Sequence, residues 1–197
     1  MDSANVIVGY GYLYTAPKGT ALPSLATQPT PSTWATAGFT EAGYTDDGVT
    51  ITYTPTFKSI EVDESMSPVD IRLVGEKLEV SVKLAEATLL NLVASIAGAT
   101  LTETSTTSTL TLGNPANPDQ GEIVLAFQGP APQSIPGTNT LGRVFVMFRA
   151  KASAAVSYHA QRKDKVVYNV KWEAMALSSA AAGAQLAEII DYTGTGS

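Results

Sequence analysis

A chain of 197 residues, with 15% charged residues, a formal net charge of −6 and no cysteine, is long enough for one domain with a buried core. The lack of cysteine excludes disulfides, thiolate metal sites and thiol nucleophiles. The low content of Lys and Arg argues against a basic nucleic-acid-binding surface. Residues 1–14 lack the pattern of a secretory signal, and no window reaches the roughly 20 apolar residues of a membrane helix, so we expect neither.

The N-terminal part of the chain is poor in periodic patterns. Residues 5–14 could form one short strand, although Gly9 and Gly11 interrupt it. Residues 16–37 hold four prolines and no apolar period. So long an aperiodic segment is typical either of a floppy connection or of an arm that meets a partner. Leu25 and Trp34 are its large apolar anchors, and they favour an inter-subunit arm.

Two alternating runs follow a turn-rich linker at residues 38–48. Asp47-Gly48 predicts a hairpin or turn just before residues 49–54, which alternate until Pro55. Residues 57–63 alternate again, with Ile60 and Val62 on one face and carboxylates on the other. The plain interpretation of Glu61 and Asp63 is a solvated strand face.

The stretch of residues 74–98 changes its period in the middle. Residues 76–84 alternate and predict a half-buried strand, and from residue 86 the spacing becomes helical. Gly98 stands where a helix end favours positive φ. We expect one packed strand-helix unit whose apolar residues are Leu78, Val80, Val82 and Leu84 on the strand and Leu89, Leu92, Val93 and Ile96 on the helix.

The second half of the chain is rich in expected strands. Residues 100–112 predict a Thr-rich hairpin, and residues 122–128, 143–150 and 165–174 predict strands, the middle one covered on both faces. Residues 178–197 are rich in Ala and Gly, and we expect a flexible tail. The fold class is therefore mainly β, a β-sandwich or partly closed barrel with one flanking α-helix and long loops, in a single domain of residues 1–197.

Residues typical of catalysis or metal binding are sparse. His159 is the sole histidine and has no nucleophile motif nearby. Asp46-Asp47-Gly48 and Asp63-Glu64 lack the spacing of ligands in a dedicated calcium loop. We therefore expect no enzyme, no cofactor and no metal.

The order of features from residue 12 to residue 99 resembles the major tail tube protein of long, non-contractile phage tails. The segments that carry the resemblance are YTAPKGTALP, the Pro-rich segment with Trp34, AGFTEAGYTDDGVTI and FKSIEVDESMSPVDIRLVGEKLEVSVKLAEATLLNLVASIAG. Residues 143–174 are similar to later strands of that family, with less specific motifs.

This resemblance implies a virion protein, assembled in the host cytoplasm, whose β-sandwich protomers form hexameric rings. The rings stack into the tube through which the genome is ejected. Implied partners are other copies of the chain, the tape measure protein, the tail terminator and the distal tail protein, while double-stranded DNA passes without tight binding. A negative lumen would repel the DNA backbone, and we expect Glu61, Asp63 and Glu79 to face it.

Two other classes remain open. One is a different virion β-sandwich, such as a capsid decoration protein. The other is a carbohydrate-binding or adhesin-type module with an aromatic patch, for which Tyr10, Tyr12 and Tyr14 are the nearest candidates.

Overall fold

The computed structural model describes residues 11–63, 67–86, 88–113, 121–131, 139–157, 167–180 and 183–194. His159 and Tyr10 lie outside these residues. The strands are β1 (Tyr12–Pro17), β2 (Thr40–Glu41), β3 (Thr45–Ile60), β4 (Asp70–Leu84), β5 (Thr100–Glu103), β6 (Ser108–Thr111), β7 (Glu122–Gly129), β8 (Asn139–Ala152), β9 (Tyr168–Ala174) and β10 (Ala187–Gly194). The helices are α1 (Pro31–Thr36) and α2 (Leu89–Ser95).

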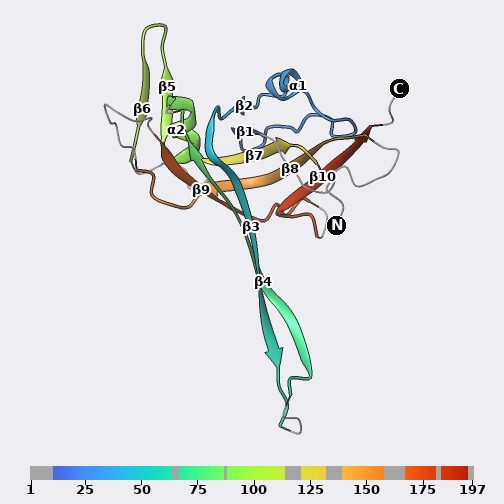
Figure 1. The fold of residues 1–197 in the computed structure, drawn as a ribbon. Coiled ribbons are helices and arrows are strands. Elements are labelled where there is room, and N and C mark those ends of the chain that lie inside the picture. The colour runs from blue at the N-terminus through green and yellow to red at the C-terminus, as the bar shows by residue number, and fades with distance from the viewer. Residues whose placement is uncertain are drawn as a thin grey trace.

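One large antiparallel sheet organises the molecule (Figure 1). Its strand order is β2-β1-β7-β8-β9-β4-β3, and β10 also pairs with β8. β5 and β6 form a separate two-stranded hairpin, as the sequence predicts. The fold is mainly β, the sheets do not close into a barrel, and a helix flanks them, which confirms the predicted fold class.

The central strands bury both of their faces, as residues 143–150 predict. On β8, Phe145 and Met147 join a first core cluster together with the inward residues of β4, β7 and β9. Val144 and Val146 point to the opposite face and join a second core cluster. Because side chains alternate along the strand, β8 contributes residues to both core clusters.

The Pro-rich segment covers the second core cluster of its own chain. Trp34 is fully buried there, with its ring centroid 5.2 Å from that of Tyr14 and 4.9 Å from that of Phe39. The Tyr192 hydroxyl donates a hydrogen bond to the carbonyl oxygen of Leu25 at 3.0 Å, and Leu25 packs against the same cluster. The predicted arm is therefore corrected for Trp34, since burial in its own chain leaves this side chain no surface for a neighbour.

Helix α1 lies inside this segment and was not predicted. The Thr30 side chain accepts a hydrogen bond from the Thr33 backbone N–H, the Thr33 side chain accepts one from the Thr30 N–H, and Pro31 occupies the first turn. These are the residues of a helix start. The helix has only six residues, too few for an apolar period.

The predicted strand-helix unit is present, but its two halves are buried to different degrees. Leu78, Val80, Val82 and Leu84 are all buried in the first core cluster. The residues that α2 buries fully are the polar Asn91 and Ser95, whereas Leu89, Leu92, Val93 and Ile96 are half-buried.

Polar contacts explain why α2 lies this way. The Asn91 amide donates to the carbonyl oxygens of Ala42 and Glu86, at 2.9 and 3.1 Å. The Trp172 indole donates to the Ala94 carbonyl oxygen at 2.9 Å. Hydrogen bonds to backbone groups, more than an apolar stripe, therefore fix this seven-residue helix.

Two further expectations are corrected by the sheet. Residues 187–194 form strand β10, paired with β8, in place of a flexible tail. Asp47 and Gly48, with φ of 65° and 76°, form a bulge inside β3 and not a hairpin turn. β3 also continues through Pro55 to Ile60, because an edge strand tolerates a residue without an N–H.

Candidate assembly surface

The hairpin of β3 and β4 extends far beyond the rest of the sheet (Figure 1). We name its outer part, residues 55–60 of β3 with residues 70–75 of β4, the distal ribbon. In the described residues it pairs only with itself, since β9 contacts β4 from Glu79 to Leu84 and no further. An isolated two-stranded ribbon is marginally stable in water.

One face of the distal ribbon is apolar. Phe57 lies opposite Leu73, and Ser59 lies opposite Ile71, and residues paired across an antiparallel ladder share a face. Phe57, Leu73 and Ile71 are 59%, 51% and 63% exposed. Thr56, Lys58 and Arg72 occupy the other face. The ribbon thus presents an uncovered apolar face to solvent, of the kind that marks an interaction site.

A bulge on β4 keeps this face continuous with the core. Tyr53 pairs with Leu78, Thr56 pairs with Gly75, and Phe57 pairs with Leu73, so Val74 is an additional residue on β4. The inward residues of β4 have even numbers near the body, such as Leu78, and odd numbers beyond the bulge. β3 alternates without interruption here, so its core face continues outwards to Phe57.

A groove opens beside the base of the hairpin. Its volume is about 350 Å³, and we name it the β10 groove. Its lining includes Ile51, Tyr53 and Leu78 from the hairpin, Phe145 from β8, and Ala187 and Ile189 from β10. Tyr53 and Ile189 are 52% and 61% exposed, so apolar side chains of the groove are open to solvent. Glu76 and Gln185 also line it, and the Tyr53 hydroxyl donates a hydrogen bond to Glu76 Oε2 at 3.0 Å.

The carboxylates predicted for the lumen lie in two separate places. β3 ends at Ile60, and Glu61 and Asp63 follow it, exposed at the tip of the hairpin. Their expected position on a strand face is corrected, because the strand stops before them. Among the described residues, neither carboxylate has an ion pair.

Glu79 lies on the polar face of β4, and lysines neutralise its charge. Its Oε1 atom is 2.7 Å from Nζ of Lys171 and 2.8 Å from Nζ of Lys77, and Lys77 also reaches Glu173 at 3.4 Å. The hydrogen bond from Lys171, followed by that from Lys77, lowers the pKa of Glu79. Lys83 on the same strand pairs with Asp47. This face is therefore balanced in charge and not acidic.

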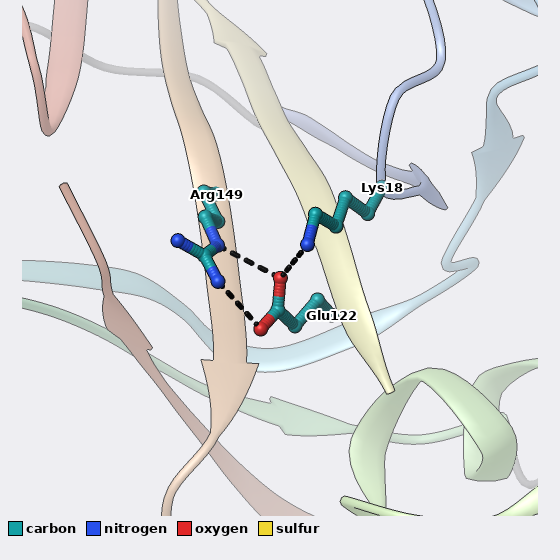
Figure 2. A network of polar contacts seen from close by, with 3 residues as sticks. All are labelled: Lys18, Glu122 and Arg149. Carbon is teal, nitrogen blue, oxygen red and sulfur yellow. Dashed lines mark hydrogen bonds and ion pairs between the residues drawn. The ribbon is translucent and has the colours of Figure 1, made fainter. Parts of the chain in front are cut away.

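An ion-pair network around the buried Glu122 joins two strands of the sheet, β7 and β8 (Figure 2). Arg149 on β8 donates two hydrogen bonds to Glu122 on β7, at 2.8 and 2.9 Å, and Lys18 approaches the same carboxylate at 3.0 Å. The Glu122 side chain is only 3% exposed. The hydrogen bond from Arg149 is the main cause that lowers the pKa of Glu122 to about 2, despite burial, which acts in the opposite direction.

We searched the described residues for an aromatic binding patch, a metal site and a membrane-spanning helix. Tyr14 is buried beneath Trp34, where burial raises its pKa to about 12, so it does not form an exposed aromatic patch with Tyr12. No group of three or more possible metal ligands gathers in the part of the chain that the structure describes. None of the helices in that part is long and apolar enough to span a membrane.

Sequence reasoning missed the apolar face of the distal ribbon. The signal was present, since Val69, Ile71 and Leu73 alternate with Asp70 and Arg72. Pro55 obscured it, because a proline inside an alternating run normally indicates the end of a strand.

A projecting ribbon with an uncovered apolar face, next to a polar face whose charges are paired, is typical of structural proteins that contact further subunits. The family model described as phage tail tube protein matches residues 1–193, and the chain belongs to this family. It is thus a structural component of the phage tail. Among curated proteins, none matches the chain significantly.

Proposed function

We propose that this protein assembles into hexameric rings that stack to form the tail tube of a long, non-contractile phage tail, the conduit for genome ejection. The observation that carries the proposal is the apolar face of the distal ribbon. Phe57, Leu73 and Ile71 are exposed and do not pack in the core, yet they continue the core-facing side of β3 and β4. No described part of the chain covers them, and in our proposal other copies of the same chain do so.

The charge on the polar face is consistent with a channel that DNA crosses without being held. Lys77, Lys171 and Lys83 could attract phosphates, but each lies against a carboxylate. Pairing reduces the number of counterions that phosphate contacts would release, and with it the affinity for DNA. In our proposal the polar face of β3, β4 and β9 lines the channel, and Glu61 and Asp63 add negative charge at the hairpin tip.

The test is assembly of the purified protein. We expect size-exclusion chromatography and negative-stain microscopy to show rings and tubes, and we expect the tape measure, terminator and distal tail proteins of the same virus to bind tube ends. The variant Ile71→Asp places a charge on the apolar face of the distal ribbon and should abolish assembly. The matched control Thr56→Asp places the same charge on the opposite face of the same ribbon and should assemble.

Both variants alter exposed positions, so their circular dichroism spectra and melting temperatures should match those of the unmodified protein. A monomer at high concentration, or ordinary tubes from Ile71→Asp, contradicts the proposal. Binding of the unmodified protein to preformed capsids without formation of tubes would instead favour a capsid decoration protein.

A further inference from the structure

The β10 groove is an open end of the first core cluster. Leu78 and Phe145 lie at its base and are 6% and 2% exposed, because the body of the protein already covers them from the other side. Ile51, Tyr53 and Ile189 form its walls and are far more exposed. Glu76, which accepts a hydrogen bond from the Tyr53 hydroxyl, and Gln185 complete the lining. The buried apolar base and the three exposed apolar side chains offer contact area for an apolar insert.

The distal ribbon has the chemistry of such an insert. Its apolar face carries Phe57, Leu73 and Ile71, and a ribbon of two strands presents these side chains as a narrow ridge. Lys58 and Arg72 on the opposite face would stay in water while the ridge is buried. One chain therefore holds both an apolar ridge and a groove that offers apolar side chains to it.

The ridge cannot reach the groove of its own chain. Ile71 pairs with Ser59, which lies six residues after the groove residue Tyr53 on the same continuous strand. At 3.2–3.4 Å per residue, this distance is about 20 Å along the strand. The two surfaces can meet only between copies.

We propose that the β10 groove receives the apolar face of the distal ribbon of a second copy, so that Ile71 and Leu73 of one copy pack against Tyr53 and Ile189 of the next. This inference rests on the proposed function and names the contact through which copies associate. Ridge and groove are different surfaces, so the contact is head-to-tail. Such contacts continue from copy to copy into a ring or a stack, whereas a self-complementary patch ends at a dimer.

Cysteine cross-linking tests the contact directly, because the natural chain has no cysteine. Purified Ile71→Cys protein is mixed with Ile189→Cys protein that carries a size tag, and the mixture is oxidised. A disulfide needs Cα atoms within about 7 Å. We expect a mixed 71–189 dimer as the main product on a non-reducing gel. Both positions are more than 60% exposed, so the substitutions should not unfold the protein.

Leu112→Cys provides the matched control, because Leu112 is 64% exposed and lies just after β6, away from the groove residues. A mixture of Ile71→Cys and tagged Leu112→Cys proteins should give no mixed dimer above random collision. The double variant Ile71→Cys with Ile189→Cys should give a ladder of cross-linked species, because each copy then offers both surfaces.

The outcomes separate this inference from the proposed function. Rings or tubes that form without the 71–189 cross-link overturn the inference and leave the function standing. A mixed 71–189 dimer without any ring or tube supports the contact, since two copies suffice for it, and contradicts the proposed function. Equal cross-linking at positions 189 and 112 overturns the inference, because the ribbon would then have no specific receptor.

Discussion

The indole N–H of Trp34 donates a hydrogen bond to Oε1 of Gln128 at 2.8 Å. The same Gln128 amide donates from Nε2 to the carbonyl oxygen of Pro29 at 3.0 Å. One side chain on β7 therefore satisfies two groups of the Pro-rich segment, in a buried setting where an unpaired polar group is costly. This pairing makes residues 18–39 a cover over the second core cluster and ties the segment to its own sheet.

Removal of the Trp34 side chain should destabilise the protomer itself. We expect Trp34→Ala to cost about 3–5 kcal/mol of unfolding free energy, as for other buried aromatic residues. Trp34→Phe should cost less, roughly 1–3 kcal/mol, because Gln128 loses its donor while much of the packing remains. Urea denaturation measures both, with the exposed Ser24→Ala as control. Unchanged stability together with lost assembly would restore the inter-subunit arm.

Acid should weaken the protein through Glu122. Its carboxylate has a pKa of about 2 in the folded chain against an ordinary 4.5, so the folded state holds fewer protons than the unfolded state between these values. The stabilisation is complete above about pH 4.5 and is lost as the pH falls towards 2. The difference corresponds to roughly 3 kcal/mol.

The variant Glu122→Gln isolates this effect. At pH 7 it should melt well below the unmodified protein, and the two melting curves should converge as the pH falls towards 2.5. The exposed Glu188→Gln is the control and should follow the unmodified protein at every pH. A constant gap between Glu122→Gln and the unmodified protein across this range would show that charge on Glu122 does not contribute.

The acidic tip of the hairpin should govern how freely DNA passes. Glu61→Lys with Asp63→Lys reverses two exposed charges without touching the apolar face, so assembly should persist. Tubes of this variant should retain DNA or slow ejection, and added salt should relieve the effect. Glu103→Lys on the exposed β5 hairpin is the control. Normal ejection at low salt would place Glu61 and Asp63 outside the channel.

The strand and the helix of the predicted unit should respond differently to truncation. Leu84 is 1% exposed, and Leu84→Ala should cost about 2–5 kcal/mol, the usual range for buried leucine. Leu92 is only half-buried, and Leu92→Ala should cost less, about 1–2 kcal/mol. Denaturant unfolding compares the two. Equal losses would mean that α2 is packed more tightly than the structure shows.

Alternation predicted β9 and the inner half of β4, whose two faces differ in polarity. The sequence also predicted β7 and β8, which bury both of their faces. Helix α2 was predicted, and its apolar residue Leu92 packs against the first core cluster. The periodic pattern does not show that the helix also buries Asn91, which bonds the carbonyl oxygens of Ala42 and Glu86. β10 was missed because its Ala- and Gly-rich surroundings predict flexibility.

The candidate surface could be predicted only in part. Alternation at Val69, Ile71 and Leu73 shows that one face of the segment is apolar. The alternation cannot show that this face extends beyond the body of the protein and is therefore uncovered. Likewise, the sequence places Trp34 in a Pro-rich segment, but the acceptor on Gln128 is far away along the chain.

The additional residue on β4, Val74, changes which residues of the strand face the core side of the hairpin. Within the body, every second residue of β4 starting at Leu78 faces the core. Beyond Val74 the residues of opposite parity, Leu73 and Ile71, continue that face as an exposed apolar surface. Loss of this one residue would leave the composition almost unchanged and would turn Leu73 and Ile71 away from Phe57. A single position in the strand thus decides which side chains of β4 share a face with Phe57.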